Sequence, residues 1–180
     1  MKILITGVAG TGKSTIVKAL SERGIDAIDL HDEPGIFFWQ NKKTKEKVEY
    51  SPIQSREFFE EVDRLCDIDK LNQLFRKYKN IVAAGTSGGS NQDEFLSQFD
   101  KILLLQSSPE VLIHRMKTRV NKSGYGKTKA EQDDTIDWRK EFDPELLSKG
   151  AIPVNTEGNL DEVVDTITEL ITSYHALKKI

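Results

Sequence analysis

A glycine-rich stretch near the start of the chain carries the strongest chemical signal in the sequence. Residues 7–14 read Gly-Val-Ala-Gly-Thr-Gly-Lys-Ser and fit the Walker A pattern G-x-x-x-x-G-K-[ST]. Glycines let successive backbone N–H groups point into one concavity that binds phosphate, and Lys13 adds a positive charge there. The Ser14 hydroxyl can ligate Mg²⁺. We expect a nucleotide phosphate site at Gly7, Ala9, Gly10, Thr11, Gly12, Lys13, Ser14 and Thr15.

Two carboxylates follow at the end of the next predicted strand. Asp29 and Asp32 lie on either side of His31, at the carboxyl end of an apolar run over residues 25–30. Open parallel sheets bind ligands at this end of their strands, where a carboxylate can hold a metal or take a proton from a hydroxyl. We expect Asp29 to bind Mg²⁺ with Ser14, and Asp29 or Asp32 to face an acceptor. The alternative is that both acids end the strand in a turn.

A basic stripe occurs later in the chain. Arg115, Arg119 and Lys122 are spaced i, i+4 and i+7, which predicts one face of a helix, and no acid lies at positions 111–130. The planar guanidinium group binds phosphate through two parallel hydrogen bonds. We expect Arg115 and Arg119 to stabilise transferring phosphates, the alternative being a solvated basic face.

The elements that would position these residues alternate along the chain. Apolar runs at 3–5, 25–30, 81–84, 102–105 and 151–154 predict strands, and amphipathic stretches predict helices at 14–23, from Ser108 onward and after Asn159. This alternation predicts an α/β fold with a parallel five-stranded sheet and helices on both faces. The segment 31–80 interrupts it: a hairpin (36–40 and 47–50) precedes helical sequence from about 52 to 78. We expect one domain over 1–180, with 31–80 as a substrate-binding insertion and 121–130 as a lid.

Composition excludes several other classes of protein. The formal net charge is only −3, which argues against a general nucleic-acid or membrane-surface binder. No apolar run is long enough to span a bilayer. The single cysteine, Cys66, cannot form an intramolecular disulfide, which favours a reducing, cytoplasmic setting. The oligomeric state is left open between monomer and homodimer.

The sequence resembles the small P-loop kinases, which include adenylate kinase, shikimate kinase and their nucleoside- and nucleotide-kinase relatives. The resemblance is specific at residues 7–15 and weaker over the rest of the chain. It implies the three-layer sandwich of P-loop NTPases, with ATP and Mg²⁺ as cofactors and phosphoryl transfer to a small molecule as the reaction.

The same resemblance assigns further roles. It implies that Gly85, Gly88 and Gly89 line the acceptor site and that Asn155 and Thr156 lie near the adenine ring. The chain departs from the family pattern at two places. Ala84 stands where adenylate-kinase-like enzymes have an aspartate, and His31 stands at the second acidic position of the shikimate-kinase-like pair. Magnesium would then depend on Ser14, Asp29 and water.

The nature of the acceptor depends on which residues of the insertion face it. A nucleotide acceptor needs a cation, for which Arg56 is the candidate, whereas a nucleoside or metabolite hydroxyl needs a carboxylate such as Asp32. The acids clustered near Asp32 favour a hydroxyl. The alternative function is a nucleotide-binding switch or NTPase module without a small acceptor. The guanine-reading pattern Asn-Lys-x-Asp of such switches is incomplete in residues 121–124, which disfavours it.

Overall fold

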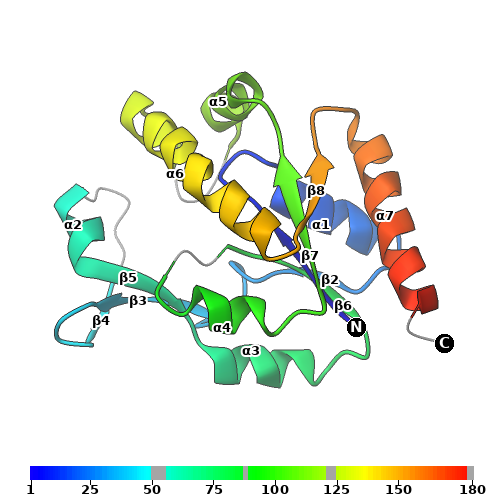
Figure 1. Cartoon of the computed structure of the whole chain (residues 1–180), viewed down its shortest axis with the longest axis horizontal. Helices are drawn as coiled ribbons and strands as arrows, with labels where there is room; N and C mark the ends of the chain where they lie inside the picture. Colours follow the sequence, from blue (N-terminus) through cyan, green and yellow to red (C-terminus); the bar gives the residue numbers. More distant parts are fainter. Residues whose placement is uncertain (50–55, 87–88, 121–124, 178–180) are drawn as a thin grey trace.

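A five-stranded parallel sheet forms the centre of the protein (Figure 1). The computed structural model describes residues 1–49, 56–86, 89–120 and 125–177. Every neighbouring pair in the central sheet is parallel, which confirms the predicted architecture. In spatial order the strands are β2 (Ala27–Asp29), β6 (Ile81–Ala84), β1 (Lys2–Thr6), β7 (Lys101–Gln106) and β8 (Ile152–Asn155).

Helices cover both faces of this sheet, because its strands carry apolar side chains on both sides. Ile3 and Ile5 of β1 pack with helices α1 (Lys13–Glu22) and α7 (Leu160–Leu177). Leu4 points to the opposite face. The helices that contribute to the core on that face are α3 (Ile68–Phe75), α4 (Gln92–Leu96), α5 (Pro109–Thr118) and α6 (Lys129–Ser148).

The insertion forms a second, antiparallel sheet of three strands. Its order is β4 (Lys47–Val48), β3 (Phe37–Asn41) and β5 (Val62–Cys66), and the short helix α2 (Arg56–Glu61) precedes β5. The predicted hairpin is confirmed by the pairing of Trp39 with Val48. The prediction of helical sequence from 52 to 78 is wrong, because β5 interrupts it.

The reason for this difference is long-range pairing. Strand β5 pairs with all five residues of β3, from Phe37 opposite Cys66 to Asn41 opposite Val62. Val62 and Cys66 are buried at its two ends. A strand partner more than twenty residues away leaves no local signal, and tertiary pairing here overrides the helical pattern.

The basic stripe also differs from its prediction. Helix α5 begins at Ser108-Pro109 as expected, but it ends at Thr118, and Arg119 has an extended backbone (φ −60°, ψ 143°). Val120 is fully exposed, so its side chain makes no buried contact that would stabilise a further helical turn. Lys122 lies outside the described residues. Arg115 and Arg119 therefore do not share a continuous helical face.

The described part of the predicted lid, residues 125–130, is tied to the start of α6. A capping box joins Thr128 and Glu131 at the start of that helix. The Gly126 N–H donates to the Glu131 carboxylate (3.1 Å), and Gln132 donates to the Gly126 carbonyl (2.9 Å). These bonds restrain the segment more than its polar composition suggests. No helix in the described ranges is long and apolar enough to cross a membrane.

Candidate active site

The glycine-rich loop joins β1 to α1 and has the backbone that its sequence predicts. Gly7, Gly10 and Gly12 have positive φ angles of 148°, 89° and 96°. A Cβ atom on Gly7 would lie 2.7 Å from the Leu105 carbonyl oxygen, so the loop passes too close to β7 for any side chain there. Thr11 is buried and donates to the Val8 carbonyl (2.9 Å). Of the remaining predicted loop residues, Ala9 is partly buried, and Ser14 and Thr15 are exposed on the first turn of α1.

The Lys13 ammonium lies over its own loop. It donates to the carbonyl oxygens of Gly7 (2.6 Å) and Val8 (3.0 Å). Burial lowers the pKa of Lys13 from 10.5 to about 8, the charges of Arg119 and Arg64 act in the same direction, and Asp29 opposes them. A lysine whose charge is destabilised in this way gains strongly from an anion that replaces the carbonyl contacts.

Ser14 and Asp29 meet at the start of α1. The Ser14 hydroxyl donates to Asp29 Oδ2 at 2.5 Å, so the two predicted magnesium ligands are brought together. The backbone N–H of His31 donates to Asp29 Oδ1 (3.0 Å), and His31 Nδ1 lies 3.0 Å from the same oxygen. Burial acts to raise the pKa of Asp29, but the hydrogen bonds from His31 and Ser14 outweigh it and lower the pKa from 3.8 to about 2. An ionised carboxylate beside a hydroxyl is a donor set that fits Mg²⁺, which takes few protein oxygens and keeps several waters.

The second acid of the predicted pair occupies a different environment. Asp32 is exposed, one turn of chain beyond Asp29, and its N–H donates to the Asp29 carbonyl (3.0 Å). His31 lies between them and stacks on Phe37 with ring centroids 5.2 Å apart. Both carboxylate oxygens of Asp29 already accept hydrogen bonds, one from Ser14 beside the phosphate loop and the other from His31. The two acids therefore differ in environment: Asp29 is hydrogen-bonded beside the phosphate loop, and Asp32 is exposed.

Arg64 is a site residue that the sequence did not identify. It projects from β5, and its guanidinium donates to the Thr86 carbonyl (3.2 Å) and lies 4.6 Å from the centroid of the Phe37 ring. Its charge acts to lower the pKa values of both Lys13 and His31. The residue lay in a predicted helix, and only the pairing of β5 with β3 reveals its position.

Arg119 directly follows the C-terminal end of α5. One guanidinium nitrogen donates to the Tyr125 carbonyl (3.0 Å). Its Nε atom is buried and has no hydrogen-bond partner among the described residues. A buried, unpartnered donor is costly, so it indicates a group that an anionic ligand would satisfy. The charges of Arg119 and Arg64 both contribute to the low pKa of Lys13.

Arg115 lies between the phosphate loop and the loop after β8. Its guanidinium donates to both oxygens of Thr156, to the carbonyl (2.5 Å) and to Oγ1 (3.3 Å), as well as to Ser107 Oγ (3.3 Å) and the Gly10 carbonyl (3.5 Å). Thr156 Oγ1 in turn donates to the Thr11 carbonyl (3.1 Å). The arginine thus braces the phosphate loop against the loop after β8. Asn155 is exposed in that second loop, where its side chain accepts from the Glu157 N–H (2.9 Å).

The loop after β6 lies against both the phosphate loop and β5. Gly85 is buried beside Leu30 and Phe37. The Thr86 hydroxyl donates to the Gly7 carbonyl (3.1 Å). A Cβ on Gly89 would lie only 1.9 Å from the Arg64 carbonyl oxygen, so a glycine is required there. Gly88 lies outside the described residues, as does the side chain of Arg56, which begins α2.

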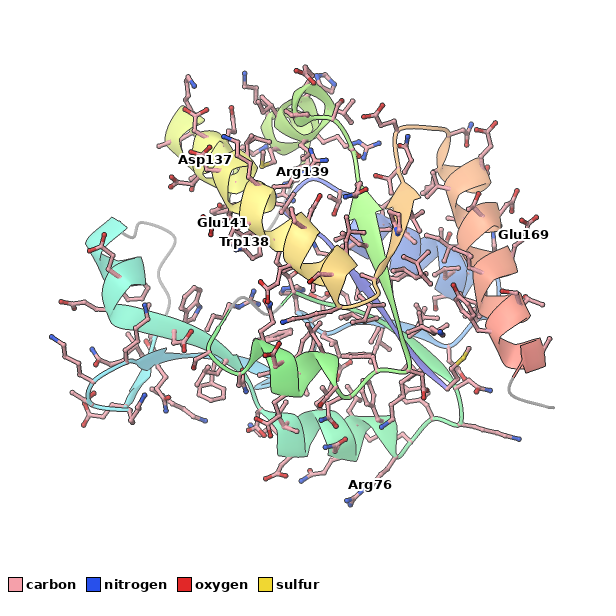
Figure 2. All side chains as sticks on the ribbon, viewed as in Figure 1. Arg76, Asp137, Trp138, Arg139, Glu141 and Glu169 are labelled. Atoms are coloured by element: carbon pink, nitrogen blue, oxygen red, sulfur yellow. The ribbon has the colours of Figure 1, made fainter. Side chains whose placement is uncertain are left out.

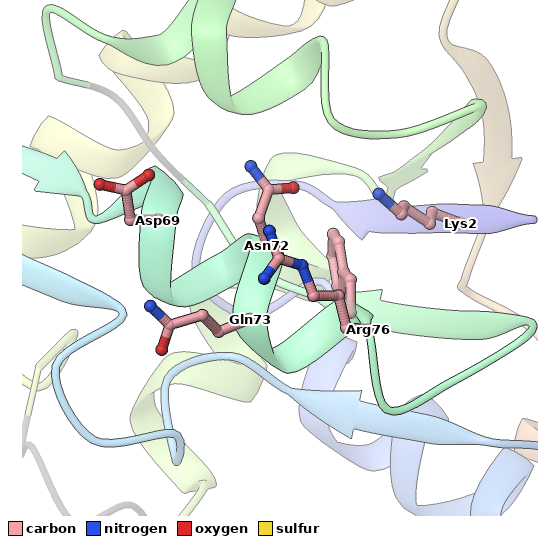
Figure 3. A pocket seen from close by; sticks show the side chains of 6 residues that line it. Lys2, Asp69, Asn72, Gln73 and Arg76 are labelled. Carbon is pink, nitrogen blue, oxygen red and sulfur yellow. The ribbon is translucent and has the colours of Figure 1, made fainter.

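A surface pocket lies at some distance from the phosphate loop, on another part of the described structure. It has a volume of about 490 Å³ and is lined by Lys2, Asp69, Asn72, Gln73, Phe75 and Arg76 (Figure 3). Lys2 begins β1, so this pocket is at the amino-terminal end of the sheet, whereas the phosphate loop follows the carboxyl end. Ligands of open α/β sheets bind at the carboxyl end, and the candidate active site is therefore the phosphate loop around Lys13.

Curated relatives and solved structures agree with this fold. The chain is 29% identical over 178 residues to a Thermococcus kodakarensis protein named "Putative adenylate kinase", which covers 95% of this chain and 85% of that protein. Shikimate kinase from Aquifex aeolicus superposes with a TM-score of 0.60 at 20% identity, over 97% of this chain and 98% of that chain. Deoxyadenosine kinase from M. mycoides with bound products superposes with a TM-score of 0.59 at 17% identity, over 96% of this chain and 100% of that chain.

At these identities, the solved structures establish the fold alone. The fold is that of the P-loop kinases, which bind nucleotides. A family model described as "AAA domain" matches residues 3–137, which include the phosphate loop, the insertion and the segment carrying Arg115 and Arg119. Because that match spans most of the chain, the protein belongs to the AAA-domain family of P-loop proteins.

Proposed function

We propose that the protein transfers the γ-phosphoryl group of ATP to a small acceptor. The observation that carries this proposal is the glycine-rich loop, which holds the Lys13 ammonium near its own carbonyls and is followed by the hydrogen-bonded Ser14–Asp29 pair. Phosphoryl transfer needs little covalent chemistry from the protein and depends on positioning and on stabilising charge. A phosphate-binding loop with the Lys13 ammonium, on whose pKa the charges of Arg64 and Arg119 act, is suited to that purpose.

Each residue of the site has a role in this proposal. The backbone of residues 7–14 holds the β- and γ-phosphates, and Lys13 exchanges its carbonyl contacts for phosphate oxygens. The buried Nε of Arg119 and the guanidinium of Arg64 stabilise the charge on the transferring group. Arg115 keeps the phosphate loop in place through Thr156. Residues 121–130 act as a lid that excludes water.

Ser14 and Asp29 are the residues that would hold Mg²⁺. When bound there, the ion would neutralise phosphate charge and orient the β- and γ-oxygens. Asp29 is suited to this purpose because its hydrogen bonds keep it ionised. That assignment leaves Asp32 to face the acceptor, where it takes the proton of a hydroxyl or orients it.

An acceptor screen tests the proposal. Purified protein is incubated with ATP, Mg²⁺ and a panel of nucleosides, nucleotides and hydroxy acids, and ADP release is compared with basal hydrolysis. We expect at least one acceptor to raise ADP release well above the basal rate and to yield a phosphorylated product. Basal hydrolysis that no acceptor stimulates would instead favour an NTPase or switch.

Paired substitutions then identify the acceptor group. Asp32→Asn should abolish transfer while leaving the binding of an ATP analogue intact, and Arg56→Ala should have a small effect. The reverse result, a tolerant Asp32 and an essential Arg56, would indicate that the acceptor's own phosphate receives the phosphoryl group.

A further inference from the structure

A second pocket lies where α4 and α6 approach the loop after β6. Its volume is about 290 Å³, and its lining comprises Gly89, Ser90, Gln92, Asp93, Trp138, Glu141, Phe142 and Glu145. The loop-borne residues Gly89 and Ser90 form one wall, and α6 forms the opposite wall. Figure 2 shows Trp138 and Glu141 on one side of α6 and Arg139 on the other.

The notable component of this pocket is an exposed indole. Sequence spacing suggests that Trp138, with Ile136 and Phe142, anchors the helix after the lid, yet Trp138 and Phe142 differ sharply in their exposure in the structure. Phe142 is 2% exposed, whereas Trp138 is 38% exposed. Their ring centroids lie 4.4 Å apart with an interplanar angle of 34°, so the buried ring supports the exposed one. An indole held on one side by a core side chain is a rigid platform for a planar ligand.

Hydrogen-bond acceptors surround this platform. Three carboxylates line the pocket, those of Asp93, Glu141 and Glu145. Lys149 forms ion pairs with Asp93 and Glu145, so negative charge remains in excess. Gln92 donates to Glu145 (2.9 Å), which leaves its amide oxygen as a further acceptor. Such a lining favours a ring that carries N–H donors and disfavours a carboxylate-bearing molecule.

Short connections join the pocket to the reaction centre. Gly89 is in close contact with Arg64, and Thr86, three residues earlier, donates to Gly7 of the phosphate loop. Even a fully extended chain from Thr86 to Ser90 spans at most about 14 Å. A ring in the pocket with a hydroxyl- or phosphate-bearing arm can therefore extend toward Lys13 and Arg64.

From this geometry we propose that Trp138 stacks on the acceptor's ring, and that the acceptor carries an amino-bearing heteroaromatic ring of nucleobase type. The inference rests on the proposed phosphoryl transfer and names the acceptor class for it. Trp138 is then a specificity-determining residue, and Glu141 is placed to accept a hydrogen bond from the amino group. Acceptors without an aromatic ring, such as sugar acids, cannot stack on the Trp138 indole.

Tryptophan fluorescence tests binding independently of catalysis. The chain has two tryptophans, so Trp39→Phe leaves Trp138 as the only one. With a non-hydrolysable ATP analogue bound, adenosine and AMP should quench this emission saturably, and gluconate should not. Equal responses to all three, or none to any, would overturn the ring-stacking proposal.

Kinetics with the same acceptors provide the second test. Trp138→Ala should lower kcat/KM at least ~10-fold for an amino-bearing nucleoside or nucleotide, as loss of one base-stacking contact predicts, with Trp138→Phe less affected. Glu141→Gln should reduce the preference for cytidine over uridine. Binding of the ATP analogue and thermal unfolding verify that each variant is folded.

The outcomes separate the two proposals. If gluconate or another ringless acceptor is phosphorylated fastest and Trp138→Ala is unaffected, the ring-stacking inference is wrong and the kinase proposal stands. If adenosine quenches Trp138 but no acceptor is ever phosphorylated, the ring site is supported and the kinase proposal fails.

Discussion

ATP binding is expected to take up protons at pH 8, and Lys13 is the group that takes them up. The ligand-free lysine has a pKa of about 8, so roughly half of the molecules carry an uncharged amine at that pH. A phosphate beside the ammonium should return the pKa to 10.5 or above. The uptake should be about half a proton at pH 8, close to one at pH 9 and near zero below pH 7.

Isothermal titration calorimetry measures this uptake directly. The apparent enthalpy of binding a non-hydrolysable ATP analogue is compared in two buffers of different ionisation enthalpy, at pH 8 and pH 9, where ATP itself is already fully ionised. Lys13→Met should remove the uptake and weaken binding. Lys18→Met is the matched control, because Lys18 lies on the same helix but is largely exposed.

The low pKa of Lys13 also determines whether the stability of the folded protein rises or falls with pH. Unfolded Lys13 retains its proton up to pH 10.5, whereas folded Lys13 loses it near pH 8. The folded state therefore binds fewer protons between these values, and stability rises with pH across that window. Below pH 8 the buried charge costs ~3 kcal/mol, at about 1.36 kcal/mol per pH unit. Lys13→Met should consequently unfold no more easily than wild type at pH 7, while Lys13→Ala should reduce turnover at least ~10²-fold.

Two results would refute this reasoning. Proton uptake that is absent from the wild type at pH 9, or that persists unchanged in Lys13→Met, would show that another group titrates. Near-wild-type turnover in Lys13→Ala would remove the phosphate-loop assignment itself.

Three further predictions concern Arg119, Asp29 and Gly89. Arg119→Ala should lower kcat more than it raises the KM for ATP, because its unpartnered Nε is available to the reacting phosphate; an unchanged kcat in steady-state assays would contradict this. Asp29→Asn should weaken the magnesium dependence of turnover, measured by Mg²⁺ titration. In wild type the Asp29 contribution to stability is complete above pH 3.8 and is lost as the pH falls through about 2. Gly89→Ala should lower the thermal unfolding midpoint by several degrees, since its Cβ would overlap the Arg64 carbonyl, whereas Gly158→Ala, with its nearest neighbour at 3.4 Å, should not.

The phosphate loop and the central sheet could be predicted from the sequence, because their signals are local. The pattern at residues 7–14 requires glycine backbones at fixed positions, and the buried strands are continuous apolar runs. The pairing of Ser14 with Asp29 was also foreseeable, since α1 begins beside the end of β2 in such a sheet. These features depend on neighbouring residues and on one general rule of parallel sheets.

Only the tertiary structure revealed the rest of the site. Arg64 reaches Thr86 because β5 pairs with β3, and a sequence with a helical pattern around Arg64 conceals that pairing. Arg115 and Arg119 share a periodicity, yet α5 ends between them, so Arg115 braces the phosphate loop and Arg119 bonds to the Tyr125 carbonyl. Trp138 and Phe142 share a face of α6, and the burial of each side chain depends on the residues that pack against that face. Local chemistry thus determined the phosphate loop, while long-range contacts decided the positions of Arg64, Arg119 and Trp138, because the energy of those contacts comes from partners distant in the chain.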